Sequence, residues 1–204
     1  MTTWIDASGG RERGVAGTIT AWARVLFAPR EFFTSAISTG DQAPGLTFAI
    51  TVSLIAALPR VLADSGGSLD AKVLEGLLVL LLIAVFVTPV GLHLVAALET
   101  VGLLAVEPDR AGVSQTVQLI AYAIAPCAVT GVCAVLVATT EGVLATMGAL
   151  IWVLATSYGA VLLVYGTAIV HETSIARATI SALVPAVILF GYVFGARTAI
   201  MAIL

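Results

Sequence analysis

The stretch GVSQTVQLIAYAIAPCAVTGVCAVLV, residues 112–137, decides the fold because it is long, apolar and uncharged, yet carries polar residues at helical spacing. The wider window 111–140 contains no Asp, Glu, Lys or Arg. A helix needs about 20 residues, at ~1.5 Å each, to cross a hydrocarbon core of ~30 Å. The stretch therefore predicts a membrane-spanning helix.

Three polar residues of this stretch, Gln115, Gln118 and Tyr122, follow an i, i+3, i+7 pattern. They share one face near the helix start, where we expect them to hydrogen-bond neighbouring helices rather than lipid. Pro126 has no N–H to bond the carbonyl of Tyr122, so a kink is predicted there.

The composition of the chain indicates that the rest of the sequence also forms membrane-spanning helices. Of its 204 residues 60% are hydrophobic and only 10% are charged, whereas soluble domains carry about 25% charged residues. Charge-free windows occur at 42–59, 76–98, 111–140, 142–170 and 178–196. The sequence therefore predicts an all-α, polytopic membrane protein, a bundle of five transmembrane helices in contact with the lipid bilayer.

We expect two regions: an N-terminal cytoplasmic or interfacial segment, 1–43, and a five-helix transmembrane domain, 44–204. The spans are predicted at about 45–63, 74–98, 113–138, 143–170 and 177–200. Pro59 and Arg60 are expected to end the first span, or to let the arginine reach the interface. The net charge of −3 is spread over the loops, which argues against nucleic-acid binding.

Before the first span, apolar residues recur at helical intervals at Val15, Ile19, Trp22 and Val25. This spacing predicts an amphipathic helix lying in the membrane interface. A cytoplasmic helix packed on the bundle is the alternative, and the pattern allows both.

The basic residues indicate an orientation, because cytoplasmic loops carry an excess of Lys and Arg. With the N-terminus cytoplasmic, three basic residues lie outside, Arg60, Lys72 and Arg197, and six lie inside: Arg11, Arg13, Arg24, Arg30, Arg110 and Arg177. We therefore expect a multi-pass protein of the cell membrane with a cytoplasmic N-terminus.

This orientation gathers polar side chains toward the cytoplasmic end. They are His93, Glu99, Gln115, Gln118, Tyr122, His171, Glu172 and Arg177. They could satisfy one another and the helix ends, form a docking surface for a protein partner, or respond to protons through the two histidines. A metal site built from His93, His171 and Glu172 is a fourth reading, but the spacing fits no metal motif and no metal is expected.

In the fifth span, Gly191, Gly195 and Ala199 place small residues at every fourth position. Small residues let another helix approach closely. Packing within the chain is the favoured reading, and a homo-oligomer formed through this span is the other.

No catalytic motif or Gly-rich phosphate loop is found, so we expect neither an enzyme nor a bound cofactor. Cys127 and Cys133 are expected to be packing residues. A small transporter or channel is the alternative function, although five spans give no paired halves.

Four segments resemble the Yip family of membrane proteins, which is named for interaction with Ypt/Rab GTPases. They are APREFF at 28–33, GLHLVAAL at 91–98, QTVQLIAYAIAP at 115–126 and LLVYGTAIVHETSIARA at 162–178, and the resemblance covers about Phe27 to Pro185. It implies a five-helix membrane domain with a cytoplasmic N-terminus.

In eukaryotes this family is associated with vesicle trafficking, membrane shaping and GTPase recruitment. The short N-terminal region and the Ala-, Val- and Leu-rich spans of this chain are closer to an archaeal or bacterial relative. The resemblance therefore implies a non-enzymatic, membrane-organising or trafficking-related adaptor. Its expected partner is a small GTPase or another membrane protein.

Overall fold

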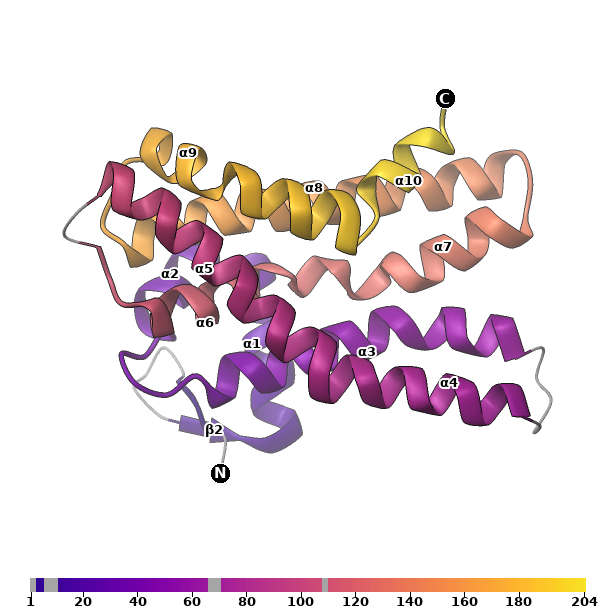
Figure 1. Cartoon of the computed structure of the whole chain (residues 1–204), viewed down its shortest axis with the longest axis horizontal. Helices are drawn as coiled ribbons and strands as arrows, with labels where there is room; N and C mark the ends of the chain where they lie inside the picture. The colour runs from indigo at the N-terminus through magenta and orange to yellow at the C-terminus, as the bar shows by residue number, and fades with distance from the viewer. Residues whose placement is uncertain (1–2, 6–10, 66–70, 108–109) are drawn as a thin grey trace.

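The computed structural model describes residues 3–5, 11–65, 71–107 and 110–204. Helices form most of this part of the chain, and five are long and apolar enough to cross a membrane (Figure 1). The predicted five-span, all-helical fold is thereby confirmed. The short antiparallel pair formed by β1, Thr3–Ile5, and β2, Arg11–Arg13, was not predicted.

Two short helices, α1 (Gly14–Phe27) and α2 (Pro29–Ser35), precede the spans. The remaining elements are, in chain order, α3 Ala43–Ser65, α4 Ala71–Leu82, the π-helix η1 Ile83–Val87, α5 Thr88–Val106, α6 Val113–Ala123, the 3-10 helix η2 Ala125–Val129, α7 Thr130–Thr139, α8 Val143–Val170, α9 Ile175–Ala186, the π-helix η3 Val187–Val193 and α10 Ala196–Met201.

Two of the spans run further than the charge-free windows indicated. The second span continues to Val106, so Glu99 lies seven residues inside its end. The first span continues through Pro59 to Ser65, so Arg60 lies within a helix rather than at its end. Both charged residues therefore belong to spans.

The third span forms the centre of the bundle. In its most apolar window 61% of the residues are buried, against 11–39% in the other four spans. Tyr122 lies between Phe32 of α2 and Phe48 of α3, with ring centroids 4.7 and 5.1 Å away. The other spans and the N-terminal helices pack around this one.

The predicted kink at Pro126 is confirmed, because α6 ends at Ala123 and a 3-10 helix follows. Trp22 of α1 donates its indole N–H to the carbonyl oxygen of Ala125 at this break, at 3.0 Å. The hydroxyl of Tyr158, halfway along α8, donates to the carbonyl of Leu26 at 2.5 Å. Helix α1 is thus attached to the middle of two spans.

Helix α1 has two apolar faces. On one face, three residues are buried against the bundle: Gly17, Ala21 and Val25. This agrees with the alternative interpretation, a helix packed on the bundle. Val15 and Ile19 are 77% and 62% exposed, which gives the helix an outward apolar surface suited to an interface.

Close packing between spans depends on glycine at one position above all. A Cβ atom on Gly131 of α7 would overlap the carbonyl oxygen of Ala56 in α3. The two helices can therefore approach this closely only without a side chain at Gly131.

We predict that Gly131→Ala lowers the free energy of unfolding by about 1–3 kcal/mol, because the added methyl group forces α3 and α7 apart. Gly91→Ala is the matched control, since no atom lies within 4 Å of a Cβ placed on this helical glycine. Thermal unfolding in detergent should rank Gly131→Ala below the parent protein and Gly91→Ala level with it or slightly above. Equal midpoints for the two variants would contradict the contact.

Candidate functional site

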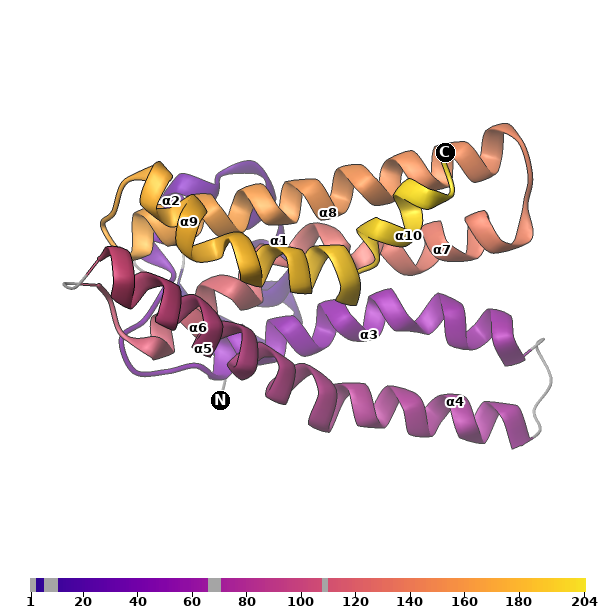
Figure 2. The same cartoon turned by 45° about the horizontal axis from the view of Figure 1, so that its top comes forward.

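The site lies at the end of the bundle where α5 ends, α6 begins, α8 ends and α9 begins, which we call the polar end (left in Figures 1 and 2). The opposite end carries the connection between α3 and α4 and the turn between α7 and α8. The structure separates the eight predicted site residues into a buried set and an exposed set.

Glu99 of α5 is completely buried, although it lies inside a membrane span. Its Oε1 atom is hydrogen-bonded to the hydroxyl of Thr167 in α8, which is also buried. The Thr167 hydroxyl lies 2.8 Å from the carbonyl of Leu163 as well. One hydroxyl proton cannot serve both oxygens, whereas a protonated Glu99 that donates to Thr167 leaves the hydroxyl proton of Thr167 for the carbonyl of Leu163.

His171 follows α8 directly and is 1% exposed. Its Nε2 atom lies 3.3 Å from the hydroxyl of Thr116, near the start of α6. Its backbone N–H donates to the carbonyl of Thr167 at 3.0 Å. Thr167 therefore connects the histidine to Glu99, and Thr116, Thr167, Glu99 and His171 form what we call the buried polar cluster.

Burial controls the charge of His171. Removal from water, with a smaller contribution from the positive charge of Arg110, lowers the pKa of the imidazole to about 4. The side chain is therefore neutral at pH 7, as a buried base without an anionic partner should be.

Three buried polar atoms have no hydrogen-bond partner in the described part of the chain: Glu99 Oε2, His171 Nδ1 and Ser114 Oγ. They come from α5, from the residue after α8 and from α6. Buried polar atoms ordinarily have a protein or water partner. Two of the three atoms, Glu99 Oε2 and His171 Nδ1, belong to the buried polar cluster, which therefore keeps unused hydrogen-bonding capacity.

The pairing of Thr116 with His171 places a hydroxyl beside a base, as nucleophilic catalysis requires. Both side chains are 1% exposed, however, and no hydrogen bond between His171 and Glu99 completes a triad in the described structure. This geometry gives a substrate no access to the hydroxyl.

The exposed set centres on an ion pair. Arg177 Nη1 lies 3.0 Å from Glu107 Oε2, and the hydroxyl of Thr173 donates to the same oxygen at 2.9 Å. These bonds connect the end of α5 with the start of α9. Glu172 is exposed in the same turn, in the left-handed region at φ 51°.

The three polar residues of the third span do not act together. Gln115 accepts from the backbone N–H of Gly112 at 3.1 Å and caps its own helix. Gln118 accepts from the backbone N–H of Ser38 at 3.1 Å and donates to its carbonyl at 2.8 Å, which fixes the loop after α2. Tyr122 belongs to the aromatic core.

His93 stands apart from His171. It is exposed on α5, with Nδ1 2.7 Å from the carbonyl of Pro89 and Nε2 3.1 Å from the amide oxygen of Gln42. Within the described ranges no group of three or more His, Cys, Asp or Glu residues could hold a metal ion.

The predicted run of small residues on one helix is broken, because the fifth span ends at Val193 and a separate helix, α10, begins at Ala196. Two of the three small residues, Gly195 and Ala199, nevertheless pack within the chain. Gly195 has φ +79°, and a Cβ there would lie 2.7 Å from the ring of Trp152. The Trp152 indole donates to the carbonyl of Phe194 at 2.5 Å. Ala199 is buried beside Trp152 and Cys133, whereas a Cβ on Gly191 would meet only Val187, at 3.9 Å.

Sequence reasoning missed the hydroxyl partners of the cluster, Thr116 and Thr167, and the acid of the ion pair, Glu107. Thr167 precedes His171 by four residues, about one helical turn, at the end of α8. This spacing was the one available signal for Thr167.

Five apolar spans with a polar cluster buried between them define a polytopic, helical membrane protein. The chain matches the Yip1 domain over residues 23–196, and it belongs to the Yip1 domain family. The resemblance noted in the sequence is thereby confirmed. No curated protein and no solved structure matches the chain.

We predict that Glu99→Gln leaves the free energy of unfolding nearly unchanged, because a neutral amide replaces a protonated carboxyl of the same shape. Glu99→Ala should cost about 1–3 kcal/mol, since Thr167 loses its partner. Thermal unfolding of both variants in detergent, at pH 7, measures the difference. A large loss for Glu99→Gln would indicate an ionised Glu99.

We also predict that acid destabilises the fold through His171. The unfolded chain binds a proton at this residue below about pH 6.5, whereas the folded protein binds it only near pH 4. The stabilisation is complete above pH 6.5 and is lost as the pH falls toward 4, by roughly 3 kcal/mol.

Unfolding temperatures at pH 7, 5.5 and 4 for the parent protein and for His171→Gln test this prediction. Carboxylates contribute to the pH dependence of both proteins. The expected result is therefore that the unfolding temperature of the parent protein falls more steeply with decreasing pH than that of His171→Gln. Parallel curves would show that His171 does not titrate as its burial requires.

Proposed function

We propose that this protein is a non-enzymatic, membrane-organising or trafficking-related adaptor that binds a protein partner through its polar end. The observation that carries the proposal is the division of the polar end. Buried polar residues bond to one another, while Glu172 and Arg177 are exposed, and Arg177 pairs with the Glu107 carboxylate. The partner is a small GTPase or another membrane protein, as membership of the Yip1 domain family suggests.

We further propose that the N-terminus is cytoplasmic and that the protein resides in the cell membrane. The excess of basic residues before the first span and at the polar end supports this orientation. Five spans then place Glu172 inside and Glu141 outside. The exposed apolar residues Val15 and Ile19 support contact of α1 with the lipid beside the bundle.

The orientation can be tested with single cysteines at two exposed positions. A membrane-impermeant maleimide should label Glu141→Cys in intact cells and Glu172→Cys only after lysis, because the two positions lie on opposite sides. Cys127 and Cys133 are buried and should give little background. The reverse labelling pattern would overturn the proposed orientation.

The docking surface can be tested by charge reversal at the same two positions. Photo-crosslinking from α9 should capture a partner that is lost, or bound at least tenfold more weakly, in Glu172→Arg. Glu141→Arg, an equal change at the opposite end, should leave capture unchanged. Arg177→Ala should weaken the partner with little loss of stability, since exposed ion pairs contribute at most about 1 kcal/mol.

Capture that survives both Glu172→Arg and Arg177→Ala would overturn the docking surface. So would equal loss in Glu141→Arg, because a general effect on folding or insertion would then explain the result. Elution as a single species in detergent confirms that each variant is folded.

A small transporter or channel is the second proposal, and burial of Glu99 within a span favours it, because intramembrane ionisable residues often mark ion pathways. Flux of protons or monovalent cations into liposomes should then exceed that of empty vesicles and fall in Glu99→Gln. Liposomes no leakier than empty ones would remove this proposal. A homo-oligomer through the fifth span stays a prediction.

A further inference from the structure

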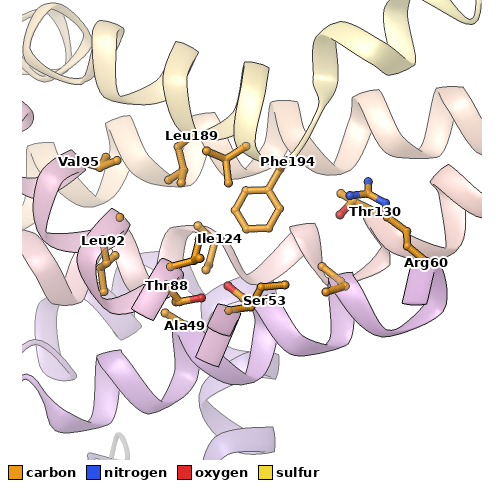
Figure 3. Close-up of a pocket in the computed structure, with 16 residues that line it drawn as sticks. Ala49, Ser53, Arg60, Thr88, Leu92, Val95, Ile124, Thr130, Leu189 and Phe194 are labelled. Atoms are coloured by element: carbon orange, nitrogen blue, oxygen red, sulfur yellow. The ribbon is translucent and has the colours of Figure 1, made fainter. Parts of the chain in front are cut away.

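A cavity of about 300 Å³ lies between α3, the junction of η1 with α5, the break in the third span, and η3, and no residue of the buried polar cluster lines it. Figure 3 shows Leu92 and Val95 toward one side of it and Arg60 toward the other. Its volume falls at the lower limit of the range that small-molecule pockets occupy.

The cavity runs along α3. Ala49, Ser53, Ala57 and Arg60 line it from successive turns of one face. Eleven helical steps separate Ala49 from Arg60, a length of about 16 Å. This is about half of the ~30 Å hydrocarbon core, and therefore the depth of one leaflet.

The wall of the cavity is apolar apart from Arg60 and three hydroxyls, those of Ser53, Thr88 and Thr130. Thr130 donates its proton to the carbonyl of Cys127 at 2.8 Å, so this hydroxyl adds little polarity. Such a wall favours a hydrocarbon chain over a polar solute.

Arg60 is the one charged residue that lines the cavity, and it lies at one end. It lies within the first span and is only partly exposed, and its guanidinium is 5.3 Å from the ring centre of Trp152. No carboxylate of the described residues pairs with it. A charge held in a span is costly without a partner, and a guanidinium binds phosphate with two parallel hydrogen bonds.

Irregular helix geometry surrounds the same cavity. Ile83 and Val87 contribute from η1, Leu189 and Val193 from η3, and Ile124 from the break in the third span. Single π-turns within helices occur frequently at functional sites. All three interrupted spans therefore bend or widen at the walls of this one space.

We propose that the cavity binds an anionic phospholipid, with one acyl chain lying along α3 and the phosphate group on Arg60. The distance along α3 from Ala49 to Arg60 equals the depth of one leaflet. The apolar wall of the cavity suits an acyl chain, and the Arg60 guanidinium suits the phosphate of a headgroup. This site is independent of the partner proposed for the polar end.

Native mass spectrometry of the delipidated full chain in detergent tests the proposal, with phosphatidylglycerol and phosphatidylcholine of identical chains as probes. The parent protein should bind one phosphatidylglycerol about tenfold more tightly than phosphatidylcholine. Arg60→Gln should reduce phosphatidylglycerol binding to the level of phosphatidylcholine, and Arg60→Lys should keep most of the preference. Ala57→Trp, which fills the cavity, should weaken both lipids.

Arg197→Gln is the matched control, because Arg197 is exposed on α10 and does not line the cavity. Equal affinities of the parent protein for the two lipids would overturn the proposal. An unchanged preference in Arg60→Gln, or an equal loss in Arg197→Gln, would do the same, as would oleate binding more tightly than phosphatidylglycerol. If Arg60→Gln does not fold, Ala57→Trp decides, since undiminished lipid binding in that variant excludes the cavity.

Discussion

The structure depends on one constraint of the bilayer, that every backbone polar group inside it must find a partner within the protein. Pro126 interrupts the third span at the centre of the bundle. The indole of Trp22 bonds the carbonyl of Ala125 beside this interruption. A broken central helix is therefore compatible with lipid because α1, which spans nothing, is packed against it. The N-terminal segment belongs to the folding unit and is more than a leader to it.

The same constraint explains the division of the polar end. Side chains that point into the bundle exchange hydrogen bonds among Glu99, Thr167, His171 and Thr116, and burial keeps the imidazole neutral. The ion pair between Arg177 and Glu107 lies instead at the edge of the bundle, where the arginine side chain is exposed. Polar side chains inside the bundle therefore bond to one another, and the exposed ones are left available for recognition.

The lengths of the uncharged windows were enough to predict the five spans, because a charge in lipid is costly whatever residues surround it. The kink at Pro126 could also be predicted, since the missing N–H of proline affects only its own helix. Glu99 was placed at a helix end because a charge closes a window in the sequence, whereas the fold conceals the carboxyl behind Thr167, 68 residues later in the chain. Gly195 was interpreted as a helical packing residue, yet its backbone is left-handed and it packs against Trp152 of another span. Partners distant in sequence leave no periodic signal, which is why the site was harder to predict than the fold.

The separation of Glu99 from Thr167 has a consequence for biogenesis. During synthesis the second span enters the membrane two spans before the helix that carries the hydroxyl partner. The nascent chain must therefore shelter a carboxyl group, neutral or hydrated, beside the insertion machinery until the fourth span emerges. If each span moved into bulk lipid as soon as it was made, the Glu99 carboxyl would have no partner in hydrocarbon. We therefore expect the second and fourth spans to pack together before either is released into bulk lipid.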